Sequence, residues 1–222
     1  SKSSFRKSRT TIKNVGKVFV ISDKKYNVIY ADPPWKFKYF SKSVTEGNPD
    51  NIPFEDSRAP QAHYGCMSID DIYKLPVQDI SADDCICFMW VTYPLLKEGI
   101  KTMEEWGFTY KTCAFSWIKT NKKSGGLFWG LGYWTRANNE ICLLGTKGKP
   151  KRVSKGVHQV VMEPIDKHSK KPNVVKDRIV ELCGDVPRIE LFARQRTQGW
   201  DVWGNEVPDE ETTEKITMEN FS

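Results

Sequence analysis

The chain has 222 residues, of which 39% are apolar and 12% aromatic, so it is long enough to fold as one domain around a sizeable core. No apolar run approaches the roughly 20 residues that a membrane-spanning helix needs, and the first residues lack the apolar segment of a signal peptide. We therefore expect an intracellular protein of the cytoplasm or nucleoid that is neither secreted nor bound to a membrane.

The formal net charge of +6 is unevenly distributed. Residues 1–17 carry lysines and arginines without an acid, and residues 147–155 form a second basic stretch. Concentrated positive charge is typical of proteins that bind polyanions, although a solvated surface is the alternative explanation. The second stretch is the stronger indication, because we expect it in a loop beside other candidate site residues. The predicted organisation is a flexible basic arm at 1–15, a single domain at 16–207 and an acidic tail at 208–222.

The cysteines and histidines do not indicate a metal site. The six cysteines contain no Cys-x-x-Cys spacing, and the three histidines have no metal-binding spacing. We expect the cysteines to be reduced and mostly buried, and we expect no metal.

A strand predicted at residues 26–31 leads directly into Asp32-Pro33-Pro34-Trp35. Proline fixes φ and has no N–H, so the chain is stiff just past the carboxyl end of the strand, where open α/β sheets bind ligands. The Asp32 carboxylate and the Pro33 carbonyl are acceptors, and Trp35 offers a flat apolar face. Together they suit a planar ring that carries an amino group. A turn with a core tryptophan is the alternative interpretation.

The rest of the chain alternates between predicted strands and helices or long connections. Nearly continuous apolar runs, such as residues 84–91, indicate strands buried on both faces, as in a parallel sheet. Helices are predicted from an N-cap at Ser68, over 94–106, and from Pro172 as a first helical residue. The other predicted strands cover 17–21, 114–118, 140–144, 159–163, 188–193 and 200–203. This alternation predicts an α/β sandwich with a mainly parallel sheet.

Two long connections have no clear period. Residues 36–63 are polar, whereas residues 122–138 combine glycines, aromatic residues and one arginine. Long connections in compact domains are often functional, so we expect the second to contact a base or another ligand.

Common nucleotide and hydrolase motifs are absent from the sequence. Gly130-Leu131-Gly132 lacks the third glycine of a dinucleotide-binding loop, and there is no Gly-Lys-Ser/Thr phosphate loop. No Ser-His-Asp or Cys-His arrangement is suggested either. These absences argue against hydrolase and NTPase functions.

Polar residues near the last strands complete the candidate site. Asn205 and Glu206 offer an amide and a carboxylate that suit a ribose. Glu190 lies in an apolar strand and needs a partner there, for which Arg188 and Arg194 are near in sequence. A purely structural ion pair is the alternative for Glu190.

The sequence resembles the MT-A70 family of S-adenosylmethionine-dependent adenine-N6 methyltransferases over about residues 16–206. Asp32-Pro33-Pro34-Trp35 matches the catalytic motif of that family, and several other segments match with it. These are His63 to Ser68, Phe88 to Thr92, Trp117 to Asn121, Trp134 to Gly148, Lys170 to Pro172, Ile189 to Arg194 and Trp203 to Glu206. The resemblance implies a class I methyltransferase Rossmann-like three-layer sandwich in which the catalytic motif precedes the cofactor-binding strand.

The resemblance also implies roles for individual residues. Asp32 and the Pro33 carbonyl are expected to accept hydrogen bonds from the adenine amine, Pro34 to shape the turn, and Trp35 to pack about the base. The other implied substrate-binding residues are Tyr64, Trp117, Trp134, Arg136 and Glu140. The residues implied to bind S-adenosylmethionine are Asp32, Lys171, Glu190, Arg194, Asn205 and Glu206. Segments 36–63 and 122–138 are expected to be the two gates of the site.

Arg196 and Thr197 stand where many family members have His-Asn, which leaves ribose contacts by these two positions open. The chain looks most like the compact bacterial and phage members, which favours DNA over RNA as the nucleic-acid partner. An RNA adenine-N6 methyltransferase, a cytosine-N4 enzyme and a catalytically silent nucleic-acid-binding subunit are the alternatives. A homodimer or a heteromeric partner is compatible with each.

Overall fold

The computed structural model describes residues 24–35, 67–130, 132, 134–166, 170–204 and 207, and the backbone of two short strands at 12–14 and 17–19. Most of the expected basic arm, the connection at 36–63 and the acidic tail lie outside the described residues, as do Tyr64, Asn205 and Glu206.

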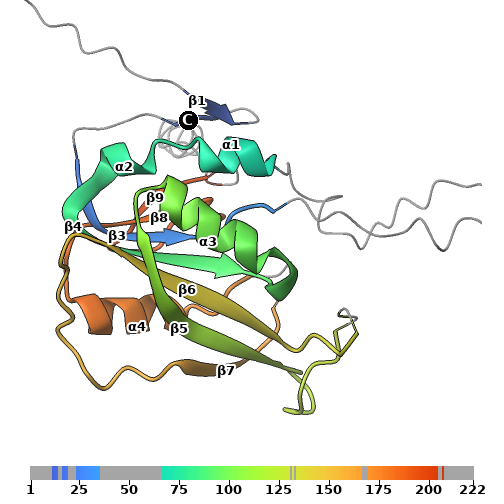
Figure 1. The fold of residues 1–222 in the computed structure, drawn as a ribbon. Helices are drawn as coiled ribbons and strands as arrows, with labels where there is room; N and C mark the ends of the chain where they lie inside the picture. The colour runs from blue at the N-terminus through green and yellow to red at the C-terminus, as the bar shows by residue number, and fades with distance from the viewer. Residues whose placement is uncertain are drawn as a thin grey trace, which may run out of the picture.

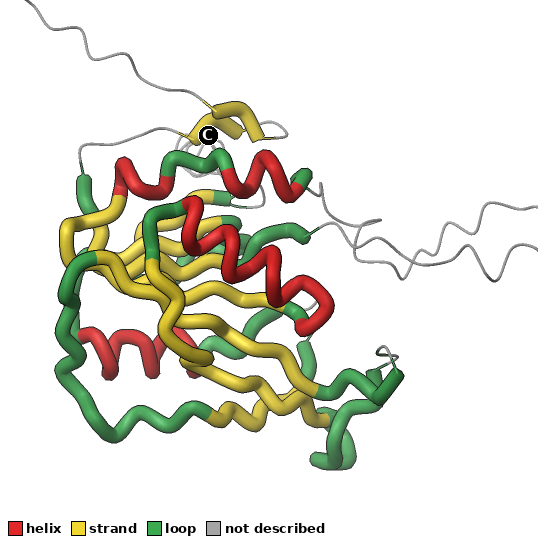
Figure 2. Tube along the Cα trace, in the orientation of Figure 1, coloured by secondary structure: helices red, strands yellow, loops and turns green. Residues whose placement is uncertain are grey.

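A seven-stranded sheet has the order β7-β5-β6-β4-β3-β8-β9 (Figures 1 and 2). Its strands are β3 (Tyr26–Ala31), β4 (Ser81–Val91), β5 (Thr109–Thr120), β6 (Asn139–Lys147), β7 (Val160–Pro164), β8 (Arg188–Leu191) and β9 (Asp201–Trp203). Strand β6 is antiparallel to both neighbours, and all other pairs are parallel. The carboxyl ends of six strands and the amino end of β6 therefore lie together at one end of the sheet. We call this end the carboxyl edge, or site edge, of the sheet. The predicted, mainly parallel sheet is confirmed.

Helices cover both faces of this sheet and make three layers (Figure 1). On one face lie α1 (Ile69–Tyr73), α2 (Val77–Ile80) and α3 (Leu96–Glu105), the last preceded by a 3₁₀ turn at Tyr93–Leu95; on the other lies α4 (Val174–Cys183). The described helices include none that is long and apolar enough to cross a membrane.

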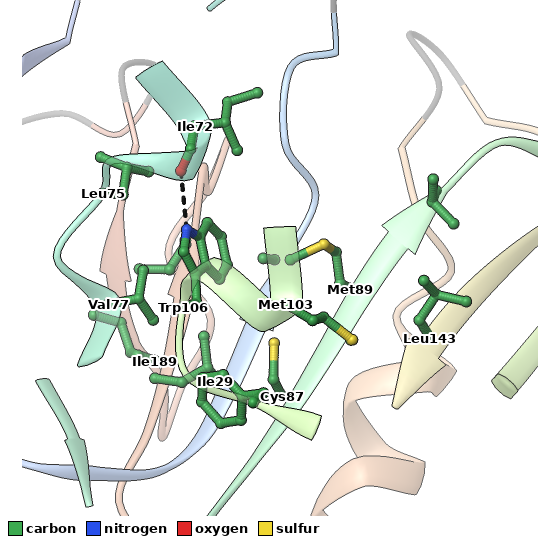
Figure 3. Close-up of a cluster of buried hydrophobic side chains, with 14 of the residues drawn as sticks. Ile29, Ile72, Leu75, Val77, Cys87, Met89, Met103, Trp106, Leu143 and Ile189 are labelled. Carbon is green, nitrogen blue, oxygen red and sulfur yellow. Dashed lines mark hydrogen bonds between the residues drawn. The ribbon is translucent and has the colours of Figure 1, made fainter. Parts of the chain in front are cut away.

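Each face of the sheet has its own hydrophobic core. Along β3, Ile29 and Ala31 pack on the side of α1 to α3, whereas Val28 and Tyr30 pack on the side of α4. This burial on both faces explains why the strand sequences are continuously apolar. In the first core the Trp106 indole donates a hydrogen bond to the Ile72 carbonyl at 2.9 Å and ties α3 to α1 (Figure 3).

Several local predictions are confirmed. Ser68 caps α1, because its hydroxyl accepts the Asp71 N–H at 3.1 Å. The described cysteines are free, and all except Cys113 are buried. Burial raises the pKa of the Cys85 and Cys183 thiols to about 12, so these two thiols behave as apolar core residues.

Two local predictions are corrected. Pro172 is not the first residue of a helix, since α4 begins at Val174 with Asn173 as its N-cap. The predicted strand at 188–193 ends at Leu191, because Phe192 has a φ of 63° and turns the chain. The strand predicted at 17–21 is described over Lys17–Phe19 as β2, which pairs with β1 (Ile12–Asn14) in a separate two-stranded sheet.

Candidate active site

The Asp32 turn is fixed by its own backbone and by β4. Asp32 follows the last residue of β3, and the Trp35 N–H donates to the Pro33 carbonyl at 2.8 Å. The Trp35 indole N–H donates to the Trp90 carbonyl at 3.1 Å, and only 7% of Trp35 is exposed. Trp35 therefore does not offer the exposed face expected from the sequence. It anchors the turn that holds Asp32 and Pro33.

Four charged side chains from four segments meet beside this turn. The Lys171 ammonium lies 3.1 Å from Asp32 Oδ1 and 3.0 Å from Glu140 Oε2. The other Glu140 oxygen, Oε1, lies 2.5 Å from the Lys119 ammonium. Asp32 directly follows β3, Lys119 is near the end of β5 and Glu140 is near the start of β6. The reversed direction of β6 is thus what brings Glu140 to the same edge as the carboxyl ends of its neighbours.

Because these side chains are largely buried, each charge strongly affects the pKa of its neighbours. Burial alone raises the pKa of Glu140, but Lys171 and Lys119 outweigh it and lower that pKa to about 2. Burial likewise lowers the pKa of Lys171, and the two carboxylates, Asp32 and Glu140, more than reverse this and raise it. Glu140 is therefore ionised and Lys171 protonated at neutral pH.

A second buried pair lies on the α4 side of the same edge. Lys176, 7% exposed, donates to Glu190 Oε2 at 2.5 Å and to the Thr197 hydroxyl at 2.8 Å. Arg188 instead pairs with Asp185, so the partner expected for Glu190 from nearby arginines is corrected to Lys176. Burial raises the pKa of Glu190 in spite of Lys176.

Aromatic residues beneath the two lysines connect both pairs. The Lys171 ammonium lies 5.5 Å from the Trp90 ring centroid, and that of Lys176 lies 5.9 Å from the Tyr30 ring. The Trp90 indole N–H donates to the Tyr30 hydroxyl at 2.7 Å. Cations over aromatic faces are stabilised when they are removed from water, so this layer supports both lysines from below.

Sequence reasoning missed Lys119 and Lys176. A signal for Lys176 exists, since it precedes the buried residues Ile179 and Cys183 by three and seven positions and so falls on the buried face of α4. A lysine on a buried helical face needs an acidic partner. Lys119 carries no comparable signal, because its neighbour Glu140 is distant in sequence and approaches only through sheet pairing.

The expected substrate-binding residues are found in different environments. Trp117 is 1% exposed and donates its indole N–H to the Glu163 carbonyl at 2.9 Å, so it supports the site from the core and offers no surface to a substrate. Trp134 is 94% exposed and Arg136 is exposed. Both lie on the connection between β5 and β6, which projects from the site edge (Figure 1).

The root of this β5–β6 arm, defined as residues 121–138, is tied to Lys119. The Lys119 N–H donates to the Asn138 carbonyl at 2.8 Å, and the Lys119 carbonyl accepts the Phe128 N–H at 2.9 Å. Within the arm the Gly130 backbone passes so close to Ala137 that a β-carbon on Gly130 would lie 2.2 Å from its carbonyl oxygen. Exposed aromatic residues are therefore presented on a backbone with defined internal contacts.

Residues near the cofactor positions are described in part. Arg194 is half-buried just past β8. Gly204 follows β9 and lies against Ala193, where a β-carbon would meet the Ala193 carbonyl oxygen at 2.0 Å. This close approach brings the residue after β9 against the segment that follows β8.

The basic stretch at 147–155 is not in a loop beside the site, and this expectation is corrected. Lys147 ends β6, and because β6 is antiparallel the chain leaves it at the edge opposite Asp32. The connection then passes the end of α4, where the Val153 N–H donates to the Leu182 carbonyl at 2.8 Å, before it reaches β7 (Figure 1).

A mostly parallel sheet with helices on both faces, and with a cluster of Asp32, Lys119, Glu140 and Lys171 at the carboxyl edge, is consistent with the class I methyltransferase fold. Residues 26–206 match the MT-A70 family, and the chain belongs to that family. It is a methyltransferase.

The similarity to individual relatives differs in extent. The type II methyltransferase M.MunI of Mycoplasma sp is 38% identical over 213 residues, which are 91% of this chain and 87% of that protein. The N(6)-adenosine-methyltransferase subunit METTL3 of Danio rerio is 27% identical over 187 residues, which are 82% of this chain but 28% of that protein. The human METTL3 catalytic subunit is 26% identical over the same shares. The chain thus spans less than a third of the METTL3 proteins.

Proposed function

We propose that this protein transfers a methyl group from S-adenosylmethionine to the N6 amino group of adenine in DNA. The observation that carries the proposal is Asp32, a carboxylate on a rigid two-proline turn, held beside Lys171 at the carboxyl edge of the sheet. The names of the METTL3 relatives, which are N(6)-adenosine methyltransferases, support adenine N6 as the acceptor.

The charges at this edge fit the proposed cofactor. S-adenosylmethionine carries a sulfonium, an ammonium, a carboxylate and a ribose diol. The carboxylates of Asp32 and Glu190 can bind the cationic groups and the ribose diol of the cofactor. The Lys171 ammonium can bind the cofactor carboxylate. The residues proposed to hold the cofactor are Asp32, Lys171, Glu190, Arg194, Asn205 and Glu206. When bound, the cofactor supplies a methyl group on a positively charged sulfur, which leaves as a neutral thioether.

The acceptors at the turn orient the adenine amine. A carboxylate has about four lone-pair sites and a carbonyl has two, so Asp32 can accept from Lys171 and from the amine, and Pro33 from Trp35 and from the amine. Two acceptors on a rigid turn direct the nitrogen lone pair toward the methyl carbon. The new nitrogen–carbon bond forms as the carbon–sulfur bond breaks, and the positively charged methylated amine then releases one proton to solvent. Catalysis on this account is positioning and electrostatics.

The substrate-side surface is proposed to comprise Tyr64, Trp134, Arg136 and Glu140. An exposed arginine and an exposed indole on the β5–β6 arm suit a phosphate and a base. A target base within a duplex must be extruded before its amine reaches Asp32, which costs a few kcal/mol. Binding by phosphate contacts is expected to weaken as salt rises.

DNA is preferred over RNA because the chain is 38% identical to the type II methyltransferase M.MunI over 87% of that protein, as expected for the compact family members that the sequence resembles, whereas it matches only 28% of the METTL3 proteins. RNA is the second candidate, favoured by the names of the METTL3 relatives. A silent nucleic-acid-binding subunit is disfavoured by the complete Asp32 turn. Both a homodimer and a complex with a heteromeric partner are compatible with this function.

Labelled methyl transfer to adenine-containing DNA and RNA oligonucleotides tests the proposal. Wild type is expected to label DNA. Asp32→Ala is expected to lose activity by at least about a hundredfold, because it removes the carboxylate that accepts a hydrogen bond from the adenine amine. Asp83→Ala, an exposed carboxylate at the start of β4, is the matched control and should retain activity. Label in RNA alone would replace the DNA assignment, and undiminished activity of Asp32→Ala would refute the catalytic one.

A further inference from the structure

We infer that Lys119 is a positioning residue, which acts through Glu140 to hold the Lys171 ammonium against Asp32. The inference rests on the proposed role of Asp32. It assigns a function to a residue that lies outside the Asp32 turn and the proposed cofactor positions.

The geometry forms one continuous chain of charge. Lys119, Glu140, Lys171 and Asp32 alternate in sign, with successive distances of 2.5, 3.0 and 3.1 Å. The Lys119, Glu140 and Lys171 side chains are only 18%, 12% and 13% exposed. Ion pairs shielded in this way are weakly screened, so a change at one end is felt at the other.

Lys119 is itself well fixed. In the antiparallel pair of β5 and β6, Trp117 lies opposite Glu140, which makes Lys119 a diagonal neighbour of Glu140 on the same face. Its ammonium lies 5.1 Å from the Trp117 ring centroid. Its backbone N–H donates to Asn138 at the end of the β5–β6 arm, and its carbonyl accepts from Phe128 within the arm. Any movement of the arm root therefore reaches Glu140 through Lys119.

The charge balance explains why Lys119 is needed. Two carboxylates and two ammonium groups sum to zero in a largely buried cluster. Without Lys119 the carboxylates of Asp32 and Glu140 compete for Lys171 alone. Glu140 has then lost its other cation and attracts Lys171 more strongly, so Lys171 is expected to move toward Glu140 and away from Asp32. Asp32 then loses the cation that fixes its orientation toward the amine.

Lys119→Met tests the inference, because it keeps most of the side-chain volume and removes the charge. Lys111→Met is the matched control, since Lys111 is an exposed lysine of the same strand, β5, near the amino end that lies away from Asp32. We expect Lys119→Met to lower kcat by about tenfold or more, as for other small misplacements, with KM for DNA changed far less. Lys119→Arg should recover most of kcat, and Lys111→Met should match wild type.

The pH profile separates positioning from general loss of stability. The ionisable groups facing Glu140 are Lys119 from β5, Lys171 from the segment before α4 and, beyond Lys171, Asp32 at the end of β3. Removing Lys119 removes one of the two cations that lower the pKa of Glu140, so this pKa rises. The acid limb of the kcat profile should therefore move to higher pH in Lys119→Met and stay in place in Lys111→Met.

Double substitution and NMR complete the test. If Lys119 acts through Glu140, Glu140→Gln and Lys119→Met should be non-additive in kcat, and additive losses would overturn the inference. The Lys171 ammonium resonance should shift in Lys119→Met and not in Lys111→Met. That measurement needs no substrate, so it decides the inference even if wild type transfers no methyl group. Unchanged kcat and an unchanged Lys171 resonance in Lys119→Met would likewise overturn it. Should Lys119→Met fail to fold, Lys119→Gln and Glu140→Gln provide the same comparison.

Discussion

Glu140 and Glu190 show how two buried glutamates at one edge of a sheet can acquire opposite properties. Each is paired with lysine, but Glu140 faces two lysines and Glu190 faces one. For Glu140 the two cations outweigh burial and lower the pKa, whereas for Glu190 burial outweighs the single cation and raises it. The number of cations therefore decides which form the fold favours.

Unfolding at different pH values should reveal this difference. Glu140 has an ordinary pKa of 4.5 that folding lowers to about 2. Its contribution to the free energy of unfolding is therefore present above pH 4.5 and is lost as the pH falls toward 2. The shift corresponds to roughly 3 kcal/mol at most. Glu190 has a raised pKa, so its contribution declines as the pH rises through that raised value.

Urea denaturation of Glu140→Gln and Glu190→Gln across acidic and neutral pH measures both effects. Glu140→Gln should lose stability relative to wild type at neutral pH and much less near pH 3. Glu190→Gln should gain relative to wild type as the pH rises. Parallel pH curves for the two variants would contradict the assignment of opposite shifts.

At the scale of an element, the β5–β6 arm contains a close backbone approach at Gly130. A β-carbon on Gly130 would lie 2.2 Å from the Ala137 carbonyl oxygen, whereas one on Gly126 would meet Ser124 Oγ at 3.6 Å. Gly130→Ala must displace the backbone near Arg136, and Gly126→Ala need not displace anything. We expect Gly130→Ala to raise KM for DNA severalfold with cofactor affinity unchanged, and Gly126→Ala to behave as wild type. Steady-state kinetics and calorimetric titration with S-adenosylmethionine check this, and equal KM values would show that the arm does not contact the substrate.

The elements were largely predictable from sequence because their signals are local. Continuous apolar runs identify β4 and β6, and Ser68 identifies the start of α1. What could not be predicted depends on pairing between distant segments. The direction of β6 decides that Glu140 joins the site and that residues 147–155 do not, and no local pattern encodes that direction. The burial of Trp35 and Trp117 is unpredictable for the same reason, because neighbouring strands and helices decide whether an indole is exposed. The sequence alone therefore indicates substrate contacts for both residues.

At the scale of the whole molecule, the sheet separates its positive charge onto two edges. Arg136 projects from the edge that carries Asp32, whereas Lys149, Lys151, Arg152 and Lys155 are exposed on the connection from the opposite end of β6. A duplex bound with its target base at Asp32 lies against the first edge. The two groups of cations should therefore contribute differently to catalysis.

Neutralising each group separately tests this arrangement with a short DNA duplex. Replacing the four far-edge cations by glutamine should leave kcat and KM within about twofold of wild type, because no phosphate contact at the site is lost. Arg136→Gln should raise KM and reduce the salt dependence of binding, since each phosphate contact removed lowers the slope by about one. If the far-edge variant raised KM as much as Arg136→Gln, the DNA would have to extend around the molecule to the edge opposite Asp32. The path of the duplex across the sheet is thus decided by comparing two KM values and two salt slopes.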